Sequence, residues 1–144
     1  MRKVSQRGLK PFNDIQLYKW GDVCELMQTP RPPMKYMTKT HGRILENLKK
    51  FASMNGYCSL SANQIFERPR MFVCLNKAKL VPQKWTGYDN VTPDDYDGVV
   101  NPIPKELSVY EEYGYEECPS VPLFKFKVKR PIEGEIEWRD ELNN

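Results

Sequence analysis

The clearest hydrophobic pattern in the chain lies between Lys35 and Asn55. One stripe there recurs at intervals of three and four residues: Met37, His41, Ile44, Leu45, Leu48, Phe51 and Ala52. That spacing predicts an amphipathic α-helix, and Gly56 is suited to end it because glycine readily adopts the left-handed conformation. His41 lies on the apolar stripe, which favours a packed, neutral histidine over a metal ligand.

Further along the chain the pattern changes to that of β-strands. The run Met71–Leu75 has the length and composition of a buried strand. Two more strands are predicted at Val99–Ile103 and Leu107–Tyr113, separated by prolines. Phe124–Lys129 and Glu135–Trp138 alternate cleanly, which predicts an antiparallel hairpin whose outward face pairs lysines with glutamates. The predicted fold class is therefore α+β, with antiparallel strands packed on one amphipathic helix.

The domain organisation follows from length and local composition. A chain of 144 residues, 40% of them hydrophobic, suffices for one domain with one core. Residues 1–13 predict a basic N-terminal arm, residues 14–144 the domain, and residues 76–97 a polar loop insertion. No apolar run approaches the length of about 18 residues that a transmembrane helix needs.

The cysteines and the histidine restrict the chemistry. No two of Cys24, Cys58, Cys74 and Cys118 have C-x-x-C spacing, which excludes a zinc ribbon. We expect reduced thiols, an intracellular protein, and core positions for Cys58 and Cys74. A single histidine excludes an H-E-x-x-H site within this sequence. We therefore expect no metal and no other cofactor.

The charge is unevenly distributed. Residues 1–88 contain 16 lysines and arginines against 5 acidic residues, whereas residues 89–144 contain 6 against 14. Two interpretations stay open at this point: chance segregation on a well-solvated surface, or a basic pole that binds a polyanion, most simply RNA phosphates. The residues predicted to contact RNA are Arg2, Lys3, Arg7, Lys10, Lys35, Lys39, Arg43, Lys49 and Lys50.

Two short stretches carry a family resemblance. The first, Tyr57–Gln64, reads Y-C-S-L-S-A-N-Q, and the second, Glu116–Pro122, reads E-E-C-P-S-V-P. With Asn101-Pro102 between them, they resemble peptide deformylase, whose signatures are G-x-G-L-A-A-x-Q and E-G-C-L-S. The resemblance runs from about Asp14 to the C-terminus, covers roughly three quarters of a deformylase, and implies a peptide-deformylase-like fold.

The resemblance also implies a site. Deformylases hold a metal ion with the cysteine of the second motif and two histidines of a helical H-E-x-x-H. The ion lowers the pKa of a bound water, and the helix glutamate moves the proton. The glutamine of the first motif and the backbone N–H after the cysteine stabilise the oxyanion. In this chain Gln64 matches that glutamine and Cys118 that cysteine, so both are interpreted as vestiges of the family's site.

Other positions depart from the family pattern. Pro119 follows Cys118 and has no N–H to donate, and Glu117 replaces the motif glycine. Tyr57 and Ser59 replace both glycines of the first motif, where a substrate backbone approaches closely. The sequence contains no H-E-x-x-H, so the C-terminal metal-binding helix is absent from it. These departures predict a pseudoenzyme rather than an enzyme, with Cys118 a small buried apolar side chain.

Three functional hypotheses follow. The first is a catalytically inactive structural component of a ribosome, in the mitochondrial matrix, on the large subunit near the exit tunnel. There it would contact rRNA and neighbouring ribosomal proteins, with no membrane span. The alternative is the N-terminal part of an active, metal-dependent peptide deformylase whose H-E-x-x-H helix is missing from this chain. A third possibility is a dimer in which a related deformylase-like chain donates that helix.

Overall fold

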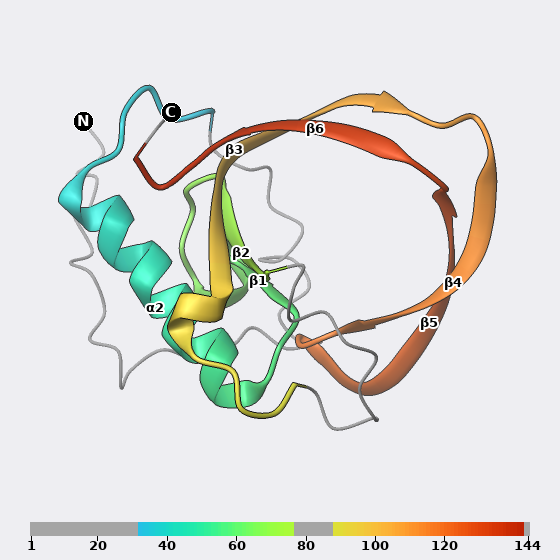
Figure 1. Ribbon diagram of the computed structural model, residues 1–144, viewed down its shortest axis with the longest axis horizontal. Helices are drawn as coiled ribbons and strands as arrows, with labels where there is room; N and C mark the ends of the chain where they lie inside the picture. The colour runs from blue at the N-terminus through green and yellow to red at the C-terminus, as the bar shows by residue number, and fades with distance from the viewer. Residues whose placement is uncertain (1–31, 77–87, 143–144) are drawn as a thin grey trace, which may run out of the picture.

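A computed structural model describes residues 32–76 and 88–142. The elements are α2 (Lys39–Asn55), β1 (Ser59–Ser61), the 3-10 turn η3 (Ala62–Ile65), β2 (Met71–Leu75), the 3-10 turn η5 (Pro93–Asp95), β3 (Tyr96–Leu107), β4 (Glu111–Cys118), β5 (Val121–Pro131) and β6 (Gly134–Arg139). Figure 1 shows one helix beside a small sheet, with long strands extending away from both. In the described part no helix is long and apolar enough to span a membrane.

The helix α2 begins four residues later than the pattern predicts because Thr38 caps it. The Thr38 side chain accepts a hydrogen bond from the His41 backbone N–H, and the His41 ring accepts one from the Thr38 N–H. This reciprocal pair is a capping box, which satisfies donors that a helix start leaves unpaired. Gly56 ends the helix in the left-handed conformation, as predicted.

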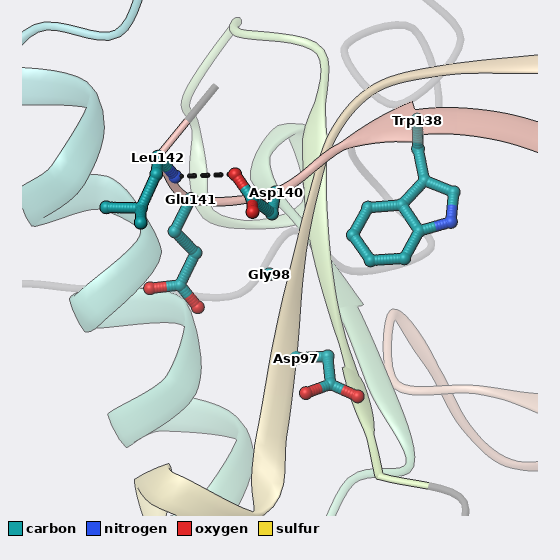
Figure 2. Close-up of a pocket in the computed structure, with 6 residues that line it drawn as sticks. All are labelled: Asp97, Gly98, Trp138, Asp140, Glu141 and Leu142. Carbon is teal, nitrogen blue, oxygen red and sulfur yellow. Dashed lines mark hydrogen bonds between the residues drawn. The ribbon is translucent and has the colours of Figure 1, made fainter. Parts of the chain in front are cut away.

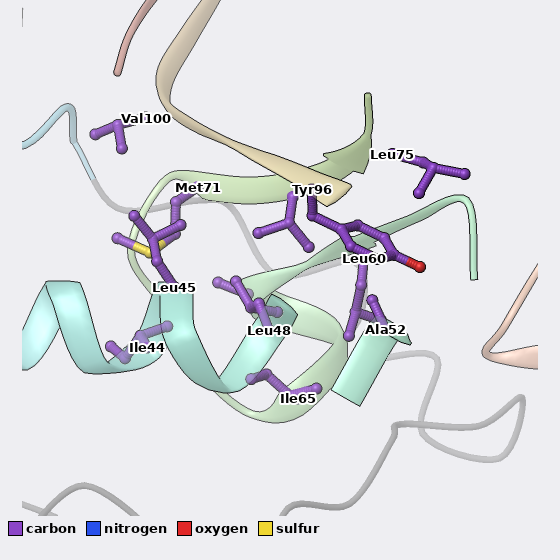
Figure 3. Close-up of a cluster of buried hydrophobic side chains, with 12 residues drawn as sticks. Ile44, Leu45, Leu48, Ala52, Leu60, Ile65, Met71, Leu75, Tyr96 and Val100 are labelled. Carbon is purple, nitrogen blue, oxygen red and sulfur yellow. The ribbon is translucent and has the colours of Figure 1, made fainter. Parts of the chain in front are cut away.

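The core lies between α2 and an antiparallel sheet of order β1-β2-β3-β6. Alternate residues of β2 (Met71, Val73 and Leu75) are buried, so one face of that strand packs toward the helix. Figure 3 shows side chains of α2 directed at those of β2 and β3. The α+β prediction, with antiparallel strands on one helix, is confirmed.

The predicted strand boundaries and pairings need correction. The strand β3 runs unbroken through Pro102 and Pro104, because irregularities in its pairing with β6 accommodate residues that cannot donate a ladder bond. The predicted hairpin of residues 124–129 with residues 135–138 is wrong. Instead β5 pairs with β4, and β6 pairs with β3.

Lysine–glutamate pairing across strands does occur, between different partners from those predicted. Three such ion pairs are Lys125–Glu117, Lys129–Glu111 and Lys105–Glu137. The first two join β5 to β4, and the third joins β3 to β6. Opposite charges on neighbouring strands favour a pairing, but they do not specify which of several acidic strands lies opposite a lysine-rich one.

We call residues 103–139 the β-arm. It contains the second half of β3 together with β4, β5 and β6, and Figure 1 shows the β4–β5 ribbon curving away from the side on which α2 lies. Its exposed large apolar side chains are Ile103, Leu107, Val109, Tyr110, Tyr113, Tyr115, Leu123, Phe124, Phe126, Ile132, Ile136 and Trp138. Among the described residues, none of the buried core positions falls in the β-arm.

Two predicted segments lie wholly or partly outside the described residues. The basic arm of residues 1–13 is outside them, and so are residues 77–87 of the predicted insertion. Tyr96 and Asp97 belong to β3 rather than to an insertion. Tyr96 is almost fully buried, and its hydroxyl donates to the Tyr57 carbonyl. The residues from Tyr88 onward therefore return to the core before the predicted loop would end.

Candidate functional site

Gln64 is positioned by the short turn η3, which follows β1 directly. Ala62 and Ile65 of this turn are buried and anchor it in the core. The Gln64 side chain folds back so that its Oε1 accepts a hydrogen bond from the Ser61 backbone N–H at 3.0 Å. Because the Ser61 backbone holds the amide oxygen Oε1, the amide nitrogen Nε2 points away from Ser61.

The Gln64 Nε2 meets the turn between β4 and β5. It donates to the Ser120 Oγ at 3.2 Å and lies 3.7 Å from the Cys118 Sγ. Ser120 is fully buried, whereas Cys118 is only partly buried. The structure thus brings Gln64 and Cys118 together across 54 residues of sequence. The prediction of Cys118 as a merely buried apolar side chain is wrong, since its sulfur faces an amide donor.

The other two described cysteines lie away from this site. Both were predicted in the core, but Cys58 is exposed and Cys74 is partly exposed. The reason for Cys74 is strand alternation, which places it on the face of β2 opposite to Met71, Val73 and Leu75. Neighbouring atoms shield each sulfur from part of the solvent even though Cys58 is exposed as a residue, and this desolvation raises the pKa of both thiols, so they are poor nucleophiles.

Three residues that depart from the deformylase motifs have defined surroundings in the structure. The Glu117 carboxylate pairs with Lys125 at 3.4 Å across the β4–β5 ribbon. The Tyr57 ring packs against Phe51 of α2, with ring centroids 6.4 Å apart, so it turns toward the core. Pro119 lies in the turn between Cys118 and Ser120 and has no backbone N–H to offer.

The described residues do not fit a metal ion by themselves. Within residues 32–76 and 88–142, no group of three or more histidine, cysteine, aspartate or glutamate side chains is placed to hold one. The Cys118 sulfur faces the Gln64 amide, and the His41 Nδ1 accepts the hydrogen bond of the helix cap. A catalytic zinc site needs about three protein ligands, of which this region offers the single position Cys118.

A separate hollow lies beside the end of β6 (Figure 2). It is lined by Asp97, Gly98, Trp138, Asp140, Glu141 and Leu142. The Glu141 carboxylate forms an ion pair with Lys49, and the Leu142 N–H donates to the Asp140 carboxylate. A Cβ at Gly98 would stand 2.8 Å from the Glu141 Cγ. These contacts fasten the segment after β6 to α2 and β3.

The residues predicted to bind RNA divide into two groups. Arg2, Lys3, Arg7 and Lys10 lie outside the described residues. The others are on or just before α2: Lys35, Lys39, Arg43, Lys49 and Lys50. Lys49 is engaged by Glu141 and is the least exposed, whereas Lys39, Arg43 and Lys50 are exposed on the helix.

The comparison with known families agrees with the geometry of the Gln64–Cys118 site. Residues 16–144 match the model of the polypeptide deformylase family. The chain belongs to the polypeptide deformylase family. No curated protein matches the chain.

Solved deformylase structures share the fold at low sequence identity. Peptide deformylase from Ehrlichia chaffeensis is 18% identical with a TM-score of 0.72, and the match covers 90% of this chain and 70% of that one. The enzyme from Thermotoga maritima is 18% identical with a TM-score of 0.70, covering 90% and 76%. A probable peptide deformylase from Synechococcus phage S-SSM7 is 17% identical with a TM-score of 0.69, covering 90% and 79%.

Membership of this family corrects one prediction from the sequence. The prediction that the chain is a pseudoenzyme is wrong, because the family it matches and its structural neighbours are peptide deformylases, which are enzymes. The substitution at Pro119 removes one backbone donor, but the Gln64 amide remains beside Cys118. The sequence gives Ser120 no base and so no role as a nucleophile, but it does not show that the Ser120 hydroxyl accepts a hydrogen bond from Gln64.

Proposed function

We propose that this chain takes part in the hydrolysis of an N-formyl amide, with Gln64 as the donor to the carbonyl oxygen. The observation that carries the proposal is the meeting of Gln64 Nε2 with Cys118 Sγ in a chain of the deformylase family. Attack on an amide places negative charge on its oxygen, and a fixed N–H group aimed at that oxygen stabilises the charge.

The chain's own residues have distinct parts in this proposal. Gln64 reaches the reaction centre from η3, and the Ser61 N–H holds its Oε1, which directs Nε2 toward Cys118 before substrate binds. Cys118 stands where the family has its ligand cysteine. The family's other two ligands are histidines, which the described residues do not supply beside Cys118, so we propose that a segment of another chain supplies them.

The β-arm supports a contribution from such a segment. Among its exposed apolar side chains are Phe126 on β5 and Ile136 and Trp138 on β6. Figure 2 shows the Trp138 side chain extending from β6, beside the hollow that it helps to line. Exposed apolar side chains in such number are typical of an interaction site, and β4, one of the strands of the β-arm, ends at Cys118.

Formate release from a formyl-methionyl peptide tests this proposal. The protein is isolated in its native form from its source and compared with a Cys118→Ser variant expressed in the same host. A Cys58→Ser variant is the matched control, because the Cys58 thiol has a hydrogen bond with Tyr88, whereas Gln64 faces Cys118. We expect release from the native protein and the control, and none from Cys118→Ser. No release from the native protein, or release unaffected by Cys118→Ser, would contradict the proposal.

We also propose that α2 contacts ribosomal RNA, which stays a prediction, as does a mitochondrial location. Support comes from Lys39, Arg43 and Lys50, which are exposed on α2 at helical spacing. In Figure 1 this helix lies on the side of the molecule away from the β4–β5 ribbon, so RNA bound to α2 would not cover that ribbon. A deformylase that binds RNA near emerging chains would meet its substrate there.

Co-sedimentation with purified ribosomes tests the RNA contact. Reversing two charges, in the variant Lys39→Glu/Arg43→Glu, is expected to weaken binding and to reduce its dependence on salt. Lys127→Glu on the β-arm is the control, because Lys127 lies over the Tyr113 ring rather than on α2. Equal sedimentation of both variants and the unaltered protein would rule out this surface.

A further inference from the structure

The turn between β4 and β5 contains a buried hydroxyl with no part in the chemistry proposed above. Ser120 is 0% exposed, and its Oγ accepts a hydrogen bond from Gln64 Nε2 at 3.2 Å. A buried hydroxyl costs free energy unless it has a hydrogen-bond partner. Here that partner is a side chain 56 residues away that belongs to the candidate site. Because it is fully buried, Ser120 is not in a position to contact substrate.

The contacts of Gln64 explain what this hydroxyl does. The Ser61 N–H holds the amide oxygen Oε1, so the opposite end of the amide, the nitrogen Nε2, points away from Ser61. The nitrogen then has two N–H groups, one of which donates to Ser120 while the other faces Cys118. The terminal torsion of glutamine is broad. With the Ser61 contact alone, the amide plane would remain free to turn its second N–H away from Cys118.

We infer that Ser120 is the positioning residue that directs the second N–H of Gln64, the one facing Cys118, at the reaction centre. This inference rests on the proposed role of Gln64 in amide hydrolysis. It gains weight from Pro119, which leaves no N–H to donate from the residue after Cys118. With that backbone donor missing, stabilisation of the oxyanion at this turn depends on the orientation of one side chain.

Nuclear magnetic resonance of the Gln64 side-chain amide tests the inference directly. In the unaltered protein we expect two resolved Nε2 protons that exchange slowly with solvent. Ser120→Ala is expected to accelerate their exchange by about tenfold, the factor that one ordinary hydrogen bond is worth. Ser120→Cys, which keeps a weaker acceptor, should fall between the two. Ser108→Ala is the control, since that hydroxyl accepts from the Tyr110 N–H in the β-arm.

A kinetic measurement separates positioning from a purely structural role. On a formyl-methionyl peptide, Ser120→Ala should lower kcat with KM unchanged, and Ser120→Cys should restore part of the loss. If the native protein shows no turnover while the amide protons still respond to Ser120→Ala, the proposed function fails and the positioning contact stands. Fast, equal exchange of both protons in the unaltered protein would overturn the inference, even if Ser120→Ala did not fold.

Discussion

At the scale of single residues, Gly56 occupies a position that only glycine fits without strain. Its φ is +65°, and an added Cβ would stand 2.7 Å from the Tyr88 carbonyl oxygen. We predict that Gly56→Ala lowers the free energy of unfolding by at least about 1–2 kcal/mol, the cost of the left-handed conformation. Gly42→Ala is the matched control inside α2, where nothing lies within 4 Å, and it should stabilise by about 0.5–1 kcal/mol.

Urea denaturation followed by circular dichroism measures both changes. Both variants replace glycine by alanine in or beside α2. If Gly56→Ala lowers the free energy of unfolding while Gly42→Ala raises it, the difference reports the left-handed backbone of Gly56 and its contact with Tyr88. A shift of both midpoints in the same direction would contradict this account of the helix end.

His41 predicts a pH dependence of stability. Its burial lowers its pKa from 6.5, against a smaller opposing effect of a hydrogen bond with the Tyr36 backbone. The folded protein therefore binds this proton less tightly than the unfolded chain. The stability that neutral His41 contributes is fully present above the pKa of this histidine in the unfolded chain, and it is lost as the pH falls through its lower pKa in the folded protein. Protonation also removes the Nδ1 acceptor that holds the Thr38 N–H.

A His41→Gln variant isolates this effect, because glutamine at the same position completes a capping box without titrating. Unfolding free energies measured from neutral pH down to about pH 5 should fall for the unaltered protein and change less for His41→Gln. Identical slopes for the two proteins would show that another group controls the acid sensitivity.

At the scale of secondary-structure elements, the sequence predicts local features better than pairings. The helix was recognisable because Ile44, Leu45 and Leu48 repeat within one short segment, and only its start depended on the Thr38 cap. The pairing of β5 with β4 was not recognisable, because the alternation of residues 124–129 is compatible with any neighbouring strand. Strand register depends on partners distant in sequence, which a local pattern does not identify.

The exposure of β4 and β5 predicts a difference in local stability. Almost every residue of these strands is exposed, whereas Val73 of β2 and Val100 of β3 are fully buried. Few buried apolar contacts allow a segment to open without unfolding the rest. Backbone amides of β4 and β5 should therefore exchange with solvent much faster than those of Val73 and Val100. If hydrogen exchange on the isolated protein showed the amides of β4 and β5 to be as protected as those of Val73 and Val100, the predicted difference in local stability would be wrong.

At the scale of the whole molecule, the site lies where the core between α2 and the β1-β2-β3-β6 sheet meets the β-arm. Gln64 comes from the turn η3 beside the core, and Cys118 comes from the end of β4. The motif resemblance identified both residues, because each stands in a recognisable stretch of sequence. It did not predict the contact with Ser120, since nothing in a linear sequence shows that two segments 56 residues apart share a hydrogen bond.

The kinetic effect of Gln64 is the most direct test of the central claim, that Gln64 and Cys118 form a deformylase-type site. Formate release from a formyl-methionyl peptide is measured for the native protein, for Gln64→Ala, and for Asn55→Ala, a control amide at the end of α2. The account predicts that Gln64→Ala lowers kcat by about 10²–10³, the usual loss for one oxyanion donor, with KM unchanged and Asn55→Ala without effect. Turnover by Gln64→Ala at the rate of the native protein would contradict it.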